Sequence, residues 1–512
     1  MFCSCLNNPN EKKPNYNVCP ICLGHPGTLP TANIKAIKKT IKLGTALNSK
    51  IAIMAKFDRK NYFYPDLPKG YQISQYDMPF CKQGMLKIRT DNKDKYIRIN
   101  RIHLEEDTGK IIHKKNNSLI DFNRAGIPLL ELVTEPDIRS EKQARKFAEE
   151  LQLIFRYLDI SEANMEKGEM RIEANISLIP IKEACFPINN KDNNKNINFN
   201  KLGTKIEIKN LNSFKALEEA IFYEIKRQTQ ILKAKQKIIQ ETRGWNEKQK
   251  ITFSQRVKET AKDYRYFPEP DLPIFFIESS IKNKAISPQY DTEYLQNTNK
   301  SLVEHLKNIS QKIRPFNVLK IESFIPVLPQ AKKTILITKH SISEKNAQIL
   351  IEKNKIGIFF EKVLKELNTK FKIIPPKLKQ IVVNYLINDL QNLQEKDNED
   401  ILISPKNFAE FSILIYNNTL SSKSAKIVLN SLFKTNKKPL TIIKEKQLSL
   451  ITDQKKIETI IKKIIQDNPE IVQKYQQGQI ETIQFLIGQT IKQSNNRIDP
   501  ILIKKFLIKI LK

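Results

Sequence analysis

The sequence predicts an α+β fold: a mixed, mainly antiparallel sheet body followed by helical segments. In the first part, apolar and polar residues alternate with a period of two, as over 96–102 and 204–208, which predicts half-buried strands. Ser140-Glu-Lys-Gln143 is a capping box that precedes apolar residues at helical spacing, so a helix should pack on the sheet there. After Pro273 the chain is rich in Lys, Leu and Ile with almost no Gly, which indicates successive amphipathic helices.

These changes of composition divide the chain into three expected domains. The α+β body covers residues 1–280, a helical domain covers 281–436, and a small tail covers 437–512. The tail holds 15 Lys/Arg and 7 Asp/Glu, so its net charge is +8. Within the body, the Asn- and Lys-rich stretch over 189–200 shows no pattern and is interpreted as a solvated loop.

The composition narrows the classes of function. Lys+Arg 87 against Asp+Glu 55 gives a charge of +32, which attracts polyphosphate backbones, although about half of this excess fits a general bias toward Lys codons. No stretch reaches the roughly 18 apolar residues of a membrane helix, and the N-terminus does not resemble a signal peptide. We therefore expect neither a membrane nor a secreted protein.

Four of the six cysteines lie within the first 22 residues. Two close pairs separated by a loop can supply four thiolates to one tetrahedral ion, the geometry of a structural zinc site. The alternative is four free thiols in a reducing compartment. The paired spacing favours zinc, with no position left open for chemistry, and the ligands are Cys3, Cys5, Cys19 and Cys22. The isolated Cys81 and Cys185 are interpreted as small hydrophobic residues.

Acidic residues mark a candidate metal site. His103-Leu-Glu-Glu-Asp107 follows a predicted strand, and its carboxylates are hard oxygen ligands that suit Mg²⁺. Glu131 is a lone carboxylate in an apolar run, and Glu173 alternates out of another predicted strand, so each needs a cation or a basic partner. Together these carboxylates fit a metal–nucleotide site. Three separate ion pairs are the alternative.

Basic and aromatic residues form a second candidate group. In the run over 56–66, Arg59 and Lys60 can hold phosphates and the tyrosines can stack on a base, unless the run is an aromatic minicore. Lys205 and Lys209 share one face of a predicted strand, which either neutralises phosphates or is a solvated edge. There is no Walker-type glycine loop. The Ser-Ser-Lys sequence at 421–423 lies between amphipathic helices and is a poor candidate for an amidase nucleophile.

Taken together, these motifs resemble the B-subunit family of tRNA-dependent amidotransferases, nearly end to end and in the same order. The matching strings are Cys3-x-Cys5 with Cys19-Pro-Ile-Cys22, Lys56-Phe-Asp-Arg-Lys-Asn-Tyr-Phe-Tyr-Pro-Asp66, His103-Leu-Glu-Glu-Asp107, Asp121-Phe-Asn-Arg-Ala-Gly126, Glu135-Pro-Asp137, Glu207-Ile-Lys-Asn-Leu-Asn-Ser-Phe214, Gln240-Glu-Thr-Arg-Gly244 and Asp263-Tyr-Arg-Tyr-Phe-Pro-Glu-Pro-Asp271, with looser matches at Phe485-Leu-Ile-Gly-Gln489 and Asn496-Arg-Ile-Asp-Pro500.

The resemblance implies a fold, a reaction and partners. The body would be a cradle domain related to glutamine synthetase that binds ATP and Mg²⁺. It would phosphorylate the side-chain carboxylate of Glu-tRNA(Gln) or Asp-tRNA(Asn), and ammonia would then displace phosphate. An amidase (A) subunit would deliver the ammonia, a small (C) subunit would complete a heterotrimer, and the helical and tail domains would grip tRNA. Neither DNA nor a membrane is an expected partner.

The resemblance also assigns residues by position. Glu106, Glu131 and Glu173 match the Mg²⁺ carboxylates of the family, although Asp is usual at the position of Glu173. The four clustered cysteines match the zinc ligands that many members have.

Family members also carry a strand with a Glu-x-His pair that completes the Mg²⁺ site, and Met1 stands where that strand would already have ended. The alternatives are a start codon assigned too late and a degraded form of the chain, and the intact remaining carboxylates favour the former. A non-catalytic, zinc-containing tRNA-binding scaffold is the alternative function. The paralogous archaeal-type subunit is discounted because there is no room for its inserted domain. The expected location is the cytoplasm of a bacterium or endosymbiont, or an organelle.

Overall fold

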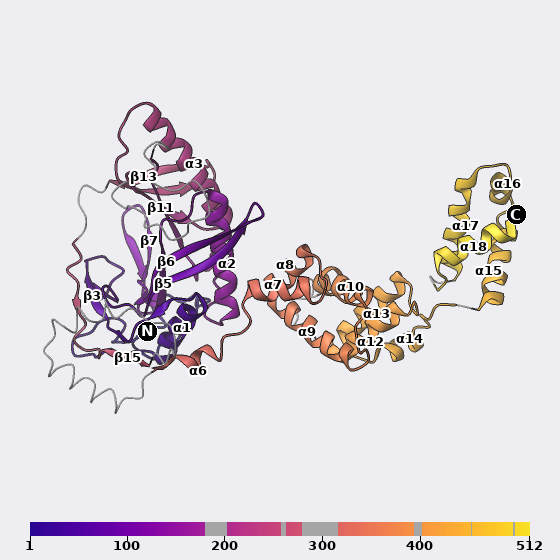
Figure 1. The fold of residues 1–512 in the computed structure, drawn as a ribbon, viewed down its shortest axis with the longest axis horizontal. Helices are drawn as coiled ribbons and strands as arrows, with labels where there is room; N and C mark the ends of the chain where they lie inside the picture. Colours follow the sequence, from indigo (N-terminus) through magenta and orange to yellow (C-terminus); the bar gives the residue numbers. More distant parts are fainter. Residues whose placement is uncertain are drawn as a thin grey trace. The chain divides into compact units, whose positions relative to one another are not determined.

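The computed structural model describes residues 1–179, 202–257, 263–278, 316–393, 402–451, 453–494 and 497–511 (Figure 1). The chain divides into two compact units, Met1–Leu328 and Pro329–Lys512. All described strands lie in the first unit and the described part of the second is helical, which confirms the mixed α+β class. The Asn- and Lys-rich stretch, Cys185 and the expected boundary at residue 280 lie outside the described residues.

The first sheet is antiparallel with strand order β1-β5-β6-β9. Its strands are β1 (Lys50–Ile51), β5 (Cys81–Thr90), β6 (Lys93–Glu106) and β9 (Pro128–Thr134). Two helices, α1 (Ile34–Ala46) and α2 (Glu141–Tyr157), share a hydrophobic core with one face of this sheet. Because side chains alternate along a strand, the buried Ile102 and Leu104 of β6 leave its neighbouring polar residues on the opposite face.

Helix α2 begins as the capping box predicts. The Ser140 side chain accepts a hydrogen bond from the backbone N–H of Gln143 at 3.3 Å. The Gln143 side chain accepts from the backbone N–H of Arg139 rather than from that of Ser140. The apolar stripe of α2 is buried, with Phe147, Leu151 and Ile154 all less than 10% exposed, so the expected packing on the sheet is confirmed.

The second sheet has strand order β10-β11-β12-β13. Its strands are β10 (Ile172–Ile176), β11 (Ile206–Leu211), β12 (Glu241–Asn246) and β13 (Ile251–Val257), and only the β11–β12 pair is parallel. Helix α3 (Phe214–Lys233), capped by the Ser213 side chain, shares a core with this sheet and with α2. The strand predicted from Thr204 begins at Ile206.

Smaller sheets surround this pair. One has the order β14 (Phe267–Pro268), β3 (Asp58–Asn61) and β4 (Tyr71–Ser74). Another has the order β16 (Phe316–Asn317), β15 (Phe275–Glu278) and β2 (Met54–Ala55). The third is the hairpin of β7 (Lys110–His113) and β8 (Ser118–Asp121), which precedes the 3-10 turn η1 (Phe122–Arg124). Val318 of α6 (Val318–Glu322) is buried in the first core, and the first unit extends to Leu328. The finer division into three domains stays a prediction.

In the second unit the described elements are helices, and six of them begin with a proline in the first turn. The described elements are α7 (Pro329–Thr338), α8 (Glu344–Glu352), α9 (Asn354–Asn368), α10 (Pro376–Asn384), the π-helical turn η4 (Tyr385–Leu390), α12 (Pro405–Tyr416), α13 (Ser422–Thr435), α14 (Pro439–Glu445), α15 (Gln454–Asp467), α16 (Pro469–Gln476), the 3-10 turn η5 (Ile480–Thr482), α17 (Ile483–Gln493) and α18 (Pro500–Leu511).

Two features of these helices bear on function. The elements from α15 onward have a hydrophobic core of their own. Ser421 caps α13 through its side chain, which gives this serine a structural role. Across the described residues, no helix combines the length and the apolar character that a membrane crossing requires.

Candidate functional site

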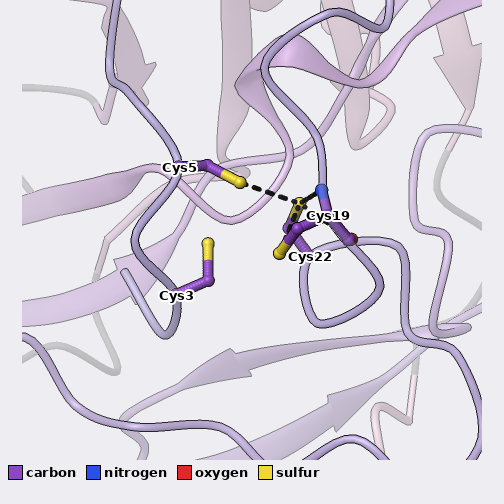
Figure 2. Close-up of side chains that lie close together, drawn as sticks. All are labelled: Cys3, Cys5, Cys19 and Cys22. Carbon is purple, nitrogen blue, oxygen red and sulfur yellow. Dashed lines mark hydrogen bonds between the residues drawn. The ribbon is translucent and has the colours of Figure 1, made fainter.

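The four clustered cysteines come together in the structure (Figure 2). Their sulfur atoms all lie within 4.8 Å of one another, with Cys19 and Cys22 3.8 Å apart and Cys5 and Cys22 4.0 Å apart. Zinc–sulfur bonds of about 2.3 Å in a tetrahedron place the sulfurs roughly 3.8 Å apart. The cluster therefore fits a zinc ion closely. We call the segment from Cys3 to Gly24 the cysteine knuckle.

The knuckle is held in place by its turn and by the sheet body beneath it. The chain reverses after Cys22, where Gly24 has a φ of +69°, and a Cβ at Gly24 would lie 2.4 Å from Cγ of Lys69. Only glycine combines this conformation with such a close approach. On the other side, the Asn123 side chain accepts backbone hydrogen bonds from Tyr16 and Asn17 at 2.8 Å each. The segment that carries Cys19 and Cys22 is thus held against the body on both sides.

The thiols influence one another's ionisation. A hydrogen bond with Cys22 lowers the pKa of Cys3 to about 4, whereas burial raises the pKa of Cys5 to about 12. The hydrogen bond with Cys3 also raises the pKa of Cys22 far above its usual value. Without a metal ion, Cys5 and Cys22 are therefore protonated at neutral pH. Both must lose their protons to become zinc ligands.

This cluster predicts proton release on zinc binding. Adding Zn²⁺ to the metal-free chain at pH 7 should release at least two protons per ion, from Cys5 and Cys22, so the zinc affinity should fall as pH falls. Titration calorimetry in two buffers with different heats of ionisation measures this number directly. Zinc binding with no proton release would contradict the thiol cluster as the binding site.

A second group of metal-ligand type lies on the polar face of the first sheet. His103 on β6 pairs in register with Glu131 on β9, and Glu105 lies two residues further along β6, so all three side chains point to one face. The His103 Nε2 atom is 3.5 Å from a Glu105 oxygen and 3.9 Å from a Glu131 oxygen. One ligand atom from each residue lies within 4.8 Å of the others. We call these three residues the acidic triad.

The surroundings of the triad keep Glu105 ionised. Burial acts to raise the pKa of Glu105, but the hydrogen bond with His103, the charge of Lys60 and the hydrogen bond from Ser74 Oγ at 2.7 Å outweigh it, and the pKa lies below its ordinary value. Nδ1 of His103 is buried, and no described residue is bonded to it. An ionised buried carboxylate, a half-exposed carboxylate and an imidazole with one unbonded nitrogen can together act as ligands to a divalent cation.

The structure does not bring the three expected carboxylates together. Glu106 points to the opposite face from Glu105, where it accepts hydrogen bonds from Lys69 Nζ at 2.6 Å and the backbone N–H of Ile73 at 2.8 Å. It lines a cavity beside the cysteine knuckle. Glu173 is half exposed on β10 and forms an ion pair with Lys209 at 3.0 Å. Of the three, only Glu131 belongs to the acidic triad.

The four expected phosphate-binding cations also separate. Arg59 donates two hydrogen bonds to the buried Glu269, at 2.7 and 2.9 Å, so it anchors β14 to β3 and does not face the triad. Lys60 is different, because its charge acts on Glu105 and its Nζ lies 5.1 Å from the Tyr264 ring centre. Lys205 is exposed just before β11, and Lys209 is paired with Glu173 and Glu207.

Comparison with known proteins decides the family. The sequence profile of the GatB/GatE catalytic domain matches residues 1–283, and that of the GatB domain matches residues 358–511. A Persephonella marina protein, named as the B subunit of aspartyl/glutamyl-tRNA(Asn/Gln) amidotransferase, is 40% identical over 516 residues, covering 100% of this chain and 96% of the relative. The chain belongs to this amidotransferase B-subunit family. The family that the sequence motifs indicated is thereby confirmed.

Two further relatives carry the same name. One, from Caldanaerobacter subterraneus subsp. tengcongensis, is 38% identical over 511 residues, which cover 99% of this chain and 94% of the relative. The other, from Thermoanaerobacter pseudethanolicus, is 38% identical over 511 residues with the same coverage. The similarity to the amidotransferase B-subunit family therefore runs through the body, the helical region and the tail alike.

From the sequence, the carboxylates of His103-Leu-Glu-Glu-Asp107 were expected to be Mg²⁺ ligands, and the resemblance selected Glu106 among them. The structure places His103 and Glu105, rather than Glu106, beside Glu131. The assignment of Glu106 as a Mg²⁺ ligand stays a prediction. The spacing of two between His103 and Glu105 was the available signal, because residues at i and i+2 share a face of a strand. The register that sets His103 opposite Glu131 depends on the pairing of β6 with β9, which the motif does not reveal.

Proposed function

We propose that this chain is the B subunit of a glutamine-dependent amidotransferase that converts Glu-tRNA(Gln), Asp-tRNA(Asn) or both into the amidated aminoacyl-tRNA. The observation that carries the proposal is the acidic triad on the sheet face opposite α1 and α2, in the domain that matches the family's catalytic domain. The cradle related to glutamine synthetase remains part of the proposal. A four-stranded sheet with helices on one face and the acidic triad on the other supports it.

The proposed reaction explains why the catalytic domain needs acidic side chains that can hold a divalent cation. A carboxylate oxygen is a poor leaving group, so ATP first transfers its terminal phosphoryl group to the side-chain carboxylate of the aminoacyl group. Ammonia then attacks the carbonyl carbon, and phosphate leaves with the oxygen that it gained. A divalent cation, when bound, neutralises charge that spreads over the phosphoryl oxygens. His103, Glu105 and Glu131 would hold that cation, and Lys60 would add a positive charge beside it.

The proposal includes cofactors and partners. ATP and Mg²⁺ would bind at the acidic triad, and Zn²⁺ would hold the cysteine knuckle as a structural ion. An amidase subunit would supply the ammonia. The Ser-Ser-Lys sequence of this chain is no candidate for that reaction, because Ser421 caps α13. A small third subunit would complete the heterotrimer. The printed names of the relatives are those of subunits that act on aminoacyl-tRNA, which supports tRNA as the substrate here. The expected place of action is the cytoplasm, where tRNA is charged.

The experiment is an amidation assay with the complete complex. Purified with its amidase and third subunit, the chain should form Gln-tRNA(Gln) or Asn-tRNA(Asn) from the mischarged tRNA with ATP and glutamine. Correctly charged Glu-tRNA(Glu) is the matched control and should stay unchanged. If the complex hydrolyses no ATP and amidates neither mischarged tRNA, the proposed function fails and only tRNA binding is left to explain.

The basic tail gives a separate prediction about tRNA. Helix α15 presents four exposed lysines, Lys455, Lys456, Lys462 and Lys463. Replacing all four with glutamine should weaken tRNA binding and reduce the slope of log affinity against log salt by about 0.7–0.9 for each lost phosphate contact. Filter binding across a salt series measures the slope. Four exposed lysines of the sheet body, Lys93, Lys110, Lys114 and Lys115, are the control set, and an equal effect of both sets would contradict a specific role of the tail.

A further inference from the structure

Arg101 lies on the same face of β6 as the acidic triad. It is two residues before His103 and four before Glu105, so the three side chains follow one another along one face at intervals of about 6.7 Å. Ile102 and Leu104, between them, are buried in the hydrophobic core on the other face. Arg101 therefore lies beside the triad, on the face of the sheet opposite this core.

The guanidinium of Arg101 has no partner in the described part of the chain. Its Nε is buried and makes no hydrogen bond, and no carboxylate among the described residues forms an ion pair with it. A buried donor without an acceptor costs roughly 1–3 kcal/mol, and more when it is charged. Buried polar groups in native proteins nearly always have a hydrogen-bond partner, and an acceptor supplied by a bound molecule is one way to complete such a site.

The neighbouring strands offer no acid at this position. The register places Lys82 of β5 and Val133 of β9 directly beside Arg101. Lys82 Nζ donates a hydrogen bond to the backbone carbonyl of Asp77 at 2.8 Å, and Val133 is apolar, so neither neighbour supplies an acceptor to Arg101. The charge of Arg101 acts on the hydroxyl group of Tyr266, which the carboxylates of Glu105 and Glu131 also reach. Arg101, Glu105 and Glu131 are therefore all close enough to Tyr266 for their charges to act on its hydroxyl group.

We propose that Arg101 binds an oxyanion of the substrate beside the acidic triad. The proposal rests on the proposed function, since it identifies the residue that receives the reacting anionic group. A guanidinium presents a planar fork of N–H donors that matches the two oxygens of a carboxylate or phosphate. The proposed reaction has two substrates that carry such an oxyanion. One is the side-chain carboxylate of the aminoacyl group, and the other is the phosphate chain of ATP.

The test uses the complete complex with Arg101→Met and Arg101→Lys. Arg101→Met should lower kcat/KM for amidation about 100-fold, and Arg101→Lys should restore part of it, because lysine keeps the charge without the fork. Arg89→Gln, an exposed arginine of the same sheet, is the matched control and should leave amidation unchanged. The KM for mischarged tRNA and the Kd for ATP, measured separately, distinguish the two sources.

A thermal stability measurement separates binding from a structural role. Because Arg101 has no described partner, Arg101→Met should keep or raise the melting temperature while it lowers activity. A higher KM for the tRNA alone identifies the carboxylate, and a higher Kd for ATP alone identifies the phosphate. Unchanged values of both, or a loss of activity that follows a loss of stability, overturn the proposal. An inactive wild-type complex in the same assay instead removes the proposed function, and this inference with it.

Discussion

Replacing Glu105 with glutamine is expected to lower amidation by roughly two to three orders of magnitude while tRNA binding is retained. Glutamine keeps the size of the side chain but removes the charge that the acidic triad offers to a divalent cation. Glu105 is only 4% exposed, and its pKa is held below the ordinary value by groups that include His103, Lys60 and Ser74, so its ionised form is the one that the fold maintains. Single-turnover amidation and filter binding of tRNA, measured on the same preparation, give the two quantities.

The control for Glu105 is Glu166→Gln. Glu166 is exposed in a turn of the same unit, so its substitution removes one negative charge without touching the triad. The Kd for Mn²⁺, measured by electron paramagnetic resonance, should rise for Glu105→Gln and stay constant for Glu166→Gln. Full amidation activity of Glu105→Gln would show that the triad is not the site of the reaction.

The second large effect is expected at the cysteine knuckle. Cys22→Ser should abolish stoichiometric zinc and lower the free energy of unfolding of the first unit by about 3 kcal/mol or more. Cys22 is 5% exposed and its sulfur lies between those of Cys5 and Cys19, so the remaining three thiols cannot complete a tetrahedral site. Zinc content by atomic absorption and urea unfolding of the purified chain measure the two consequences.

Cys81→Ala is the matched substitution for this experiment. Cys81 is a fully buried thiol in the first sheet, beside Gly44 and away from the knuckle. Its replacement should cost some packing energy but leave one zinc ion per chain. If Cys22→Ser keeps both its zinc and its stability, the four cysteines are free thiols, the alternative that the sequence left open.

Local features of the sequence were sufficient for much of the fold. Ser140 and the apolar spacing behind it predict α2, because capping and periodicity act within a few residues. The alternation over 96–102 predicts the centre of β6 for the same reason. The two cysteine pairs predict their own cluster, since each pair is close in sequence and only one loop must close.

Contacts between residues that lie far apart in the sequence could not be predicted from capping, periodicity or spacing. Arg59 looked like a free cation in a basic, aromatic run, but it pairs with Glu269, which follows it by 210 residues. Glu106 and Glu173 looked like partners of Glu131, yet strand register assigns Glu106 to the opposite face, and Lys209 neutralises Glu173. Sequence spacing fixes the face within one strand, whereas which strands lie side by side depends on tertiary packing.

The central claim is that this chain activates a carboxylate by phosphorylation, and an isotope experiment tests it most directly. The side-chain carboxylate of the glutamate on Glu-tRNA(Gln) is labelled with heavy oxygen, and the complete complex converts it with ATP and glutamine. If the carboxylate is phosphorylated, one labelled oxygen leaves with the phosphate, and mass spectrometry finds labelled inorganic phosphate in proportion to the Gln-tRNA(Gln) formed. Amidated product accompanied by unlabelled phosphate would contradict the account.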